Sequence, residues 1–200
     1  MRTLFFEQTG KSFVVSDIHN GTKLSEVHIQ ATEFAASVAY TLDHLITKGV
    51  LASRHDIERV AVRVVAPGTY FAQHRALDAA YVQELEKAAQ SAPLHIPGLL
   101  TEIAAVQQEL GQAAVIAVSD SAFHTTIPDY VSTISIAKAD AQTYDIKRFG
   151  YHGLSFASLT RRLQSTFQEL PSRVIMCHIG GGISVAAVHN GKSVATSMGY

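Results

Sequence analysis

The sequence predicts an α/β fold in which an antiparallel meander is followed by crossover units on a parallel sheet. Three observations predict it: short segments rich in β-branched residues open the chain, amphipathic segments follow them, and apolar segments of strand length alternate with these helices. A strand, a helix and a second strand in that order form a crossover unit, in which the two strands are parallel. The meander is expected at one edge of the fold.

The opening segment predicts the meander and one helix. Strands are expected at residues 3–6, 12–18 and 24–29, with turns at Thr9-Gly10 and Asn20-Gly21, because these glycines allow the backbone angles of tight turns. Helical spacing begins at Thr32, a suitable N-cap, and ends at Gly49. The apolar stripe of this helix consists of Phe34, Val38, Leu42 and Leu45.

The middle of the chain predicts strands alternating with helices. Residues 59–65 are mostly β-branched and alternate little, which predicts a parallel strand covered on both faces. Helical spacing returns at residues 78–89 and 97–110, where Pro97 suits a first turn and Gly111 a C-terminal cap. A short apolar strand is expected at residues 113–118.

The last part of the chain predicts a helix and a second meander. The helix spans residues 154–167 and carries Phe156, Leu159, Leu163 and Phe167 on one side. Strands are expected at residues 173–178, 184–189 and 192–196, and the Asn190-Gly191 pair between the last two favours a type I′ turn. Because this second meander repeats the opening of the chain, the sequence suggests two similar halves, the second incomplete.

Composition and charge narrow the function classes. Hydrophobic residues make up 47% and charged residues 16% of the chain, which is typical of a globular protein. The formal net charge is −1 and the basic residues are scattered singly, so no nucleic acid and no membrane surface is expected as a partner. The chain has a single cysteine, Cys177, and it has neither an apolar run long enough to span a bilayer nor the apolar core of a signal peptide. We therefore expect it in the cytoplasm.

A glycine cluster follows the predicted strand at residues 173–178. The run His178, Ile179, Gly180, Gly181 and Gly182 leaves several backbone N–H groups clear of side chains, which suits a loop that binds phosphate oxygens. A flexible hairpin turn is the other interpretation. Glycine content alone does not separate the two.

Three histidines lie in suggestive settings, at His95, His124 and His152. None has metal-ligand spacing, and one cysteine cannot build a zinc site. His152 lies beside glycines just before a predicted helix, where it can donate a hydrogen bond to an anionic group that the helix dipole also favours. A capping or buried histidine is the alternative.

Two charged residues stand out at predicted strands. Asp120 directly follows the strand expected at residues 113–118, and open α/β sheets bind their ligands at the carboxyl ends of strands. A turn or helix-cap aspartate is the alternative. Arg63 lies inside an otherwise apolar strand, so it is expected either to pair with an internal carboxylate or, as we favour, to face a cleft and bind an anionic ligand.

Four linked motifs near the end of the chain resemble the acetate kinase family in order and spacing. They are RFGYHGLS at 148–155, CHIGGGIS at 177–184, NGKS at 190–193 and TSMGY at 196–200, which the family writes RYGFHGTS, CHLGNGAS, NGKS and DTSMGF. Upstream, SDSAFH at 119–124, PLHIP at 93–97 and RVV at 63–65 are similar to its FDTAFH, PLHNP and HRVVHGG. The resemblance covers essentially the whole chain.

This resemblance implies an α/β fold of ribonuclease-H-like domains, as in the actin, hexokinase and acetate kinase superfamily. Residues 1–146 would form the amino-terminal domain and residues 147–200 the beginning of a second. The implied activity is that of an acetate kinase-type phosphotransferase, which uses ATP and Mg²⁺ to phosphorylate a short-chain carboxylate (acetate, propionate or butyrate) reversibly to an acyl phosphate. The family also suggests a homodimer.

The matching motifs assign roles to individual residues. By resemblance, the catalytic residues are Asp120 and His152. The substrate site would consist of Arg63, Val65, Leu94 and His95. The nucleotide site would include His178, Ile179, Gly180, Gly181 and Gly182.

The chain departs from the family pattern in two places. At the amino terminus the family has a metal-binding Asn and a small-residue phosphate loop that ends in Lys; Glu7 and Val14 stand at those positions, with Lys11 between them. After Arg63, the His-Gly pair of the family is replaced by Ala66-Pro67. The resemblance therefore assigns no metal ligand in this chain.

Two functions of different classes follow. The family continues past the last motif to a second catalytic arginine, adenosine-binding segments and a metal-binding glutamate, so the chain is expected to be the amino-terminal half of such an enzyme. In the first hypothesis the chain belongs to a working short-chain acyl kinase. In the second it is a catalytically inactive, truncated or diverged homologue that acts as a binding or interaction domain.

Overall fold

The computed structural model describes residues 1–10, 12–30, 36–167 and 169–199. The chain divides into two compact units. Unit 1 comprises Met1–Val60 and Pro97–Ala114, and unit 2 comprises Ala61–Ile96 and Val115–Tyr200. Both contain helices and strands, so the predicted mixed α/β class is confirmed.

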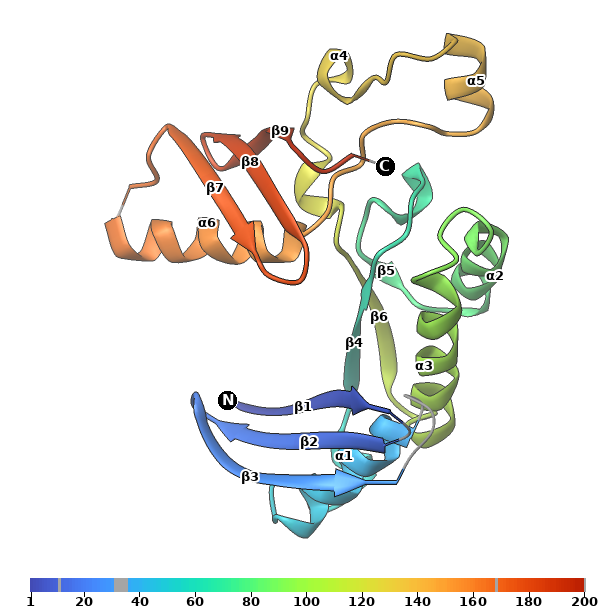
Figure 1. Cartoon of the computed structure of the whole chain (residues 1–200), viewed down its shortest axis with the longest axis vertical. Coiled ribbons are helices and arrows are strands. Elements are labelled where there is room, and N and C mark those ends of the chain that lie inside the picture. The colour runs from blue at the N-terminus through green and yellow to red at the C-terminus, as the bar shows by residue number, and fades with distance from the viewer. Residues whose placement is uncertain (11, 31–35, 168, 200) are drawn as a thin grey trace. The chain divides into compact units, whose positions relative to one another are not determined.

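Unit 1 opens with the predicted meander (Figure 1). Strands β1 (Arg2–Thr9), β2 (Ser12–His19) and β3 (Thr22–Ile29) form an antiparallel sheet in that order, each longer than its prediction. Asn20 and Gly21, between β2 and β3, have φ values of 48° and 83°, as a type I′ turn requires. Glu7 and Val14 are paired across the β1–β2 hairpin.

Two helices belong mainly to unit 1. Helix α1 (Ala36–Thr47) ends before Gly49, which has a φ of 65° and stops the helix as predicted. The predicted N-cap, Thr32, and Phe34 lie outside the described residues. Helix α3 (Ile96–Glu109) buries Leu99, Ile103, Val106 and the following Leu110. The cap expected at Gly111 is wrong, because this glycine does not have the positive φ of such a cap.

A buried carboxylate links the sheet of unit 1 to α1. Asp17 on β2 is 2% exposed, and its oxygens lie 2.5 Å from Nη2 of Arg2 and 2.8 Å from Nε2 of His44. The hydrogen bond from Arg2 outweighs burial, and with that from His44 it holds the pKa of Asp17 far below its usual range. Because the folded chain holds this carboxylate ionised, Asp17 stabilises unit 1 most above the unfolded pKa of about 3.9.

Replacing Asp17 with Asn should lower the thermal unfolding midpoint at neutral pH by roughly 5 °C or more, because the partly buried Arg2 guanidinium loses its counter-charge. The difference from the unmodified protein should shrink between about pH 5 and about pH 2, since the unfolded chain then takes up a proton that the folded carboxylate excludes. Circular dichroism melts over this pH range measure both effects.

The matched control is Asp43→Asn, whose carboxylate is 65% exposed and pairs with Arg54. Exposed ion pairs contribute little, so its midpoint should move by no more than about 2 °C. Equal shifts in the two variants would contradict a special contribution from Asp17.

The second sheet has the order β4 (Arg59–Val64), β6 (Ala114–Ser119), β5 (Arg75–Ala76). Strands β4 and β6 are parallel, since Ala114 N–H donates to the Glu58 carbonyl and Asp120 N–H to that of Val64. The prediction that β4 is covered on both faces is wrong: exposed and more buried residues alternate along it. Because the residues on both faces of β4 are mostly apolar, the sequence pattern did not indicate this alternation.

Helix α2 (Ala79–Ala88) confirms the helix predicted at residues 78–89, whereas the short edge strand before it, β5, was not predicted. Asp78 caps it, because its side chain accepts a hydrogen bond of 2.9 Å from Tyr81 N–H. Tyr81 and Leu85 on the helix are fully buried, so α2 contributes its apolar face to the core of unit 2.

The second predicted meander is also present in unit 2 (Figure 1). Strands β7 (Arg173–Ile179), β8 (Ile183–His189) and β9 (Lys192–Thr196) form an antiparallel sheet in that order, and α6 (Gly153–Phe167) packs on it. Their shared core consists of Phe156, Met176, Ala186 and Val188. Phe167, expected on the same apolar stripe, is 60% exposed, because the helix ends there.

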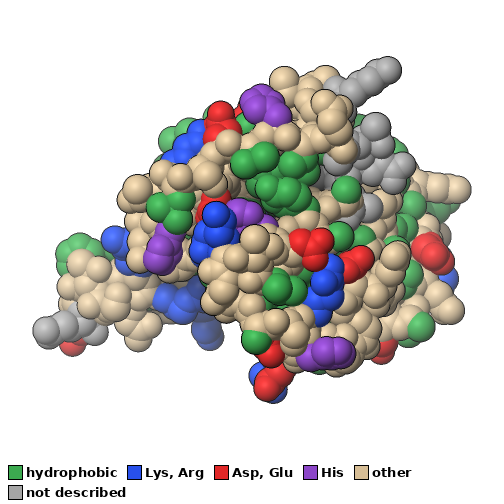
Figure 2. Space-filling view, turned by 90° about the horizontal axis from the view of Figure 1, so that it is seen from below, with side chains coloured by type: hydrophobic (Ala, Val, Ile, Leu, Met, Phe, Trp, Pro, Cys, Tyr) green, Lys and Arg blue, Asp and Glu red, His purple; other side chains and the backbone are tan. Residues whose placement is uncertain are grey.

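Short helical segments complete the described chain. They are η1 (Arg54–Asp56), η2 (Thr69–Phe71), η3 (Ala122–His124), α4 (Asp129–Ser132) and α5 (Lys138–Thr143). Acidic and basic side chains are interspersed on the face shown in Figure 2. None of the helices in the described residues has the length and apolar character needed to cross a bilayer.

Candidate functional site

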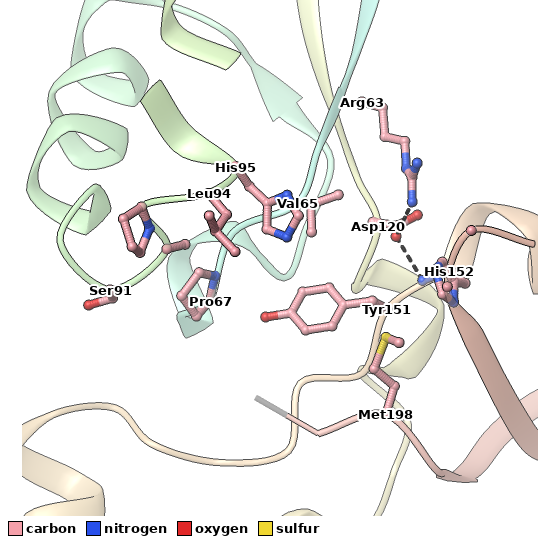
Figure 3. A pocket seen from close by; sticks show the side chains of 14 residues that line it. Arg63, Val65, Pro67, Ser91, Leu94, His95, Asp120, Tyr151, His152 and Met198 are labelled. Atoms are coloured by element: carbon pink, nitrogen blue, oxygen red, sulfur yellow. Dashed lines mark hydrogen bonds and ion pairs between the residues drawn. The ribbon is translucent and has the colours of Figure 1, made fainter. Parts of the chain in front are cut away.

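A pocket of about 690 Å³ lies within unit 2 (Figure 3). Its wall contains residues from the carboxyl end of β4, the segment before α3, the end of β6, the segment before α6, the loop between β7 and β8, and the segment after β9. The residues that line it are Arg63, Val65, Pro67, Ser91, Ala92, Pro93, Leu94, His95, Asp120, Tyr151, His152, Gly181, Gly182 and Met198.

Asp120 forms the charged centre of this wall. It follows β6 directly and is 1% exposed, as expected for a residue at the carboxyl end of a parallel strand that serves a site. Its Oδ2 accepts hydrogen bonds of 2.8 Å from Nη2 of Arg63 and 2.7 Å from the backbone N–H of His152 (Figure 3). The carboxylate therefore joins β4 to the start of α6 rather than capping its own turn.

The environment of Asp120 keeps its carboxylate ionised. Burial raises its pKa, but the hydrogen bonds from Arg63 and the His152 N–H, together with the Arg63 charge and the nearby Leu154 N–H, lower the pKa below its usual value. In the described residues no group completes a hydrogen bond to the buried Oδ1. Oδ2 thus has two protein partners, whereas Oδ1 is buried without a completed hydrogen bond.

Arg63 combines the two alternatives that its sequence position left open. It pairs with the internal carboxylate of Asp120 and also lines the pocket. Its side chain is 55% exposed, because β4 is not covered on both faces as predicted. The alternation along β4 puts Arg63 on the more exposed face, where its remaining N–H donors reach the pocket.

His152 is held in an uncommon backbone conformation. Its φ is 59°, in the left-handed region that non-glycine residues rarely adopt. The His152 N–H bonds the Asp120 side chain, and the next N–H, that of Gly153, donates to the Asp120 carbonyl at 2.8 Å. These two bonds tie the start of α6 to the end of β6, where a Cβ on Gly153 would lie only 2.4 Å from the Asp120 carbonyl oxygen.

Replacing Gly153 with Ala should lower the free energy of unfolding by about 3 kcal/mol or more, because backbone and not a flexible side chain occupies the space of the new methyl group. Urea titration measures the change.

The control is Gly98→Ala in α3, where a Cβ meets nothing within 4 Å. In a helix, alanine is favoured over glycine by up to about 1 kcal/mol, so this variant should be as stable as the original or more so. A Gly153→Ala protein of unchanged stability would contradict the close contact with Asp120.

The ring of His152 contacts one residue on β7 and one on β8. It is stacked on His178 of β7, with centroids 4.0 Å apart, and its Nδ1 lies 2.9 Å from Oγ of Ser184 on β8. Burial and the neighbouring His178 lower the pKa of His152. At neutral pH the ring is therefore uncharged.

The glycine cluster forms the loop between β7 and β8. Gly181 and Gly182 line the pocket, whereas Ile179 is 79% exposed and, like Gly180 and His178, is not part of the lining. A Cβ on Gly182 would lie 3.0 Å from both Cε1 and Nε2 of His152. Glycine at this position therefore makes room for the histidine ring.

The remaining predicted substrate residues lie in the same pocket. Val65, Leu94 and His95 line it, although Leu94 is 90% exposed. Sequence reasoning gave no role to Tyr151 and Met198, which also line the pocket. For Tyr151, its place directly before His152 in the RFGYHGLS motif was an available signal.

His124, from the SDSAFH motif, is not in the pocket but supports it. Its ring is 3% exposed; Nε2 donates to the Tyr151 carbonyl at 3.0 Å and Nδ1 lies 2.8 Å from Oγ of Ser193 on β9. Burial lowers the pKa of His124. The ring therefore ties η3 to the RFGYHGLS segment and to the second meander.

Replacing Arg63 with Gln should raise the pKa of Asp120, since burial then acts against fewer hydrogen bonds and no guanidinium charge. Carbon-13 NMR of the aspartate carboxyl groups measures this titration. Arg75→Gln is the control, because Arg75 stacks on the ring of Tyr70 and forms no ion pair with Asp120. An unchanged Asp120 pKa in Arg63→Gln would contradict the assigned role of the ion pair.

The donor set suits a metal ion that needs few protein ligands. The described residues contain no cluster of three or more His, Cys, Asp or Glu side chains of the kind that binds a metal alone. Mg²⁺ is commonly bound by one or two carboxylates together with water and phosphate oxygens. Asp120, the acidic residue of the pocket lining, is the side chain that fits that requirement.

Comparison with known proteins identifies relatives over nearly the whole chain. The model of the acetokinase family matches residues 4–200. The chain is 33% identical to the acetate kinase of Shouchella clausii over an alignment of 198 residues that covers 97% of this chain and 50% of that protein. It is 36% identical to the acetate kinase of Geobacillus kaustophilus over 185 residues, covering 90% of this chain and 46% of that protein.

Solved structures share the fold. A propionate kinase from Francisella tularensis aligns with a TM-score of 0.79 at 24% identity, covering 99% of this chain and 57% of that one. The acetate kinase of Entamoeba histolytica aligns with a TM-score of 0.75 at 24% identity, covering 100% of this chain and 55% of that one. The chain spans about half the length of the curated relatives that it matches.

Proposed function

The chain belongs to the acetokinase family, and from this we propose that it is part of an acetate kinase-type phosphotransferase. The reaction is the reversible, ATP-dependent phosphorylation of a short-chain carboxylate (acetate, propionate or butyrate) to an acyl phosphate. The observation that supports it best is that Arg63, Asp120 and His152 are joined by hydrogen bonds of 2.8 and 2.7 Å at the wall of one pocket.

In this proposal Arg63 binds the substrate carboxylate. Its planar guanidinium is anchored to Asp120 by one nitrogen, which fixes the orientation of its other donors. Val65 and Leu94 contribute apolar surface for a short alkyl group, and His95 lies with them in the lining. A carboxylate oxygen is already a nucleophile, so the site needs positioning more than a general base.

His152 and the glycine loop act on the anionic group that is transferred. His152, Gly181 and Gly182 line one pocket, where ring and backbone N–H donors would stabilise the charge of a phosphoryl group. His178, Ile179 and Gly180 belong to the same nucleotide loop in this proposal. ATP with Mg²⁺ supplies the phosphoryl group when bound, and Asp120 is the residue that would hold the metal.

The architecture of the whole protein is part of the proposal. Residues 1–146 would be an amino-terminal ribonuclease-H-like domain and residues 147–200 the beginning of a second. The matching order of the two meanders supports such a repeat. We further propose a cytoplasmic homodimer that binds neither nucleic acid nor membrane.

A second candidate is a binding or interaction domain without catalysis. It is favoured by the exposed Glu7 and by Val14, which pair with each other in the β1–β2 hairpin where the family has metal-binding and phosphate-binding residues. In this candidate the pocket keeps its affinity for carboxylates but transfers no phosphate.

A hydroxamate assay with Mg-ATP and acetate, propionate or butyrate separates the two candidates. The product of the complete reading frame should form acyl phosphate, and failure to do so with all three acids would overturn the kinase proposal. Acyl phosphate formed by the 200-residue chain alone would exclude the binding-only candidate. Calorimetric binding of the same acids without turnover would support it.

Variants test the assigned residues in the active protein. His152→Ala and Arg63→Ala should each lower kcat/KM by about a hundredfold or more, because each removes a donor to the reacting groups. His28→Ala is the control, since His28 is exposed on β3 and does not line the pocket. Activity unchanged in either pocket variant would remove that residue from the mechanism.

A further inference from the structure

The His152 ring has its Nδ1 edge against β8 and its Nε2 edge beside Gly182, a residue of the pocket lining. Nδ1 lies 2.9 Å from Oγ of Ser184. Nε2 lies on the side of Gly182, where a Cβ would approach it to 3.0 Å, and His152 and Gly182 both line the pocket. Which ring nitrogen carries the proton therefore decides whether the pocket meets a donor or an acceptor.

Ser184 is the polar member of an otherwise apolar row. The inward-facing residues of β8 are Ser184, Ala186 and Val188, and the last two belong to the core around Phe156. Ser184 is 0% exposed. Its Oγ has one hydrogen-bond partner in the described part of the chain, the Nδ1 of His152.

That single partner determines the direction of the bond. If Nδ1 carried the proton, it would donate to Oγ and leave the buried O–H of Ser184 without an acceptor, which is costly. If Ser184 donates to Nδ1, its only proton is used. The neutral ring then carries its own proton on Nε2.

A second histidine in the same unit has a matching arrangement. Nε2 of His124 faces the Tyr151 carbonyl, which can only accept, so Nε2 carries the proton. Its Nδ1 accordingly accepts from Ser193, which is also 0% exposed. In this pair the buried serine, which lies on β9, donates to Nδ1 of the histidine. Ser184 lies in the corresponding way on β8.

We propose that Ser184 is a positioning residue whose hydroxyl donates to Nδ1 of His152 and holds the ring in the Nε2–H form, with that N–H directed to an anionic group in the pocket. Stacking on His178 and the glycine at position 182 keep the ring in this plane. The identity of the anion as a transferred phosphoryl group rests on the proposed function; the tautomer does not.

Long-range proton–nitrogen NMR of histidine-labelled protein tests the tautomer directly. The chain has ten histidines, so the His152 signals are assigned by their loss in His152→Gln. At neutral pH, Nδ1 of His152 should give the unprotonated pattern and Nε2 the protonated one. A protonated Nδ1 in the unmodified protein would overturn the proposal.

Variants of the serine give the causal test. Ser184→Ala should shift Nδ1 of His152 and mix its tautomers while leaving the His124 signals unchanged, which also reports that the fold is retained. Ser193→Ala should do the reverse. Ser184→Thr and Ser184→Val are a matched pair of equal shape: the hydroxyl of Thr should preserve the original pattern and Val should abolish it. The same His152 pattern in all these variants would overturn the proposal.

Kinetics separate this inference from the proposed function. In the active protein Ser184→Ala should lower kcat by about tenfold to a hundredfold, with the KM for the carboxylate nearly unchanged and with recovery in Ser184→Thr. If the unmodified protein forms no acyl phosphate, the proposed function fails, and the NMR result alone then decides the role of Ser184.

Discussion

A carboxylate buried at the end of β6 constrains most of the site in unit 2. Asp120 is 1% exposed and ionised, and a buried charge is tolerated only when it is paired and hydrogen-bonded. The chain meets this requirement from two directions, with Arg63 on β4 and the backbone N–H of His152 before α6. The left-handed backbone of His152 and the glycine at position 153 follow from that approach.

The same contacts give the pocket an ordered set of donors. Because Asp120 fixes one end of the Arg63 side chain and the backbone of His152, these groups lose little freedom when an anion binds. The ring of His152 is then held by the second meander, through Ser184 and His178. The second meander thus holds the side of the pocket on which His152 lies.

Much of the fold was predictable because its signals are local. Both meanders, α2, α3 and α6 were expected near their observed positions, since Asn-Gly turns and helical spacing act within a few residues. The errors concern packing and the ends of helices. The exposure along β4 depends on what lies beside that strand, whereas Phe167 is exposed because α6 ends there and Gly111 lacks the positive φ of a cap. Neighbouring residues in the sequence do not specify these features.

The site shows the same division between local and tertiary information. The sequence by itself determined the family, because its motifs have the order and spacing of that family. It also identified Arg63, Asp120 and His152 as candidate site residues. Only the tertiary structure decided that Asp120 bonds both of the others, that Arg63 is exposed while paired, and that Ser184 lies at Nδ1 of His152. The physical reason is that these hydrogen bonds and the burial of side chains depend on distances between segments far apart in the chain. Motifs and turns, in contrast, depend on residues that are consecutive in the sequence.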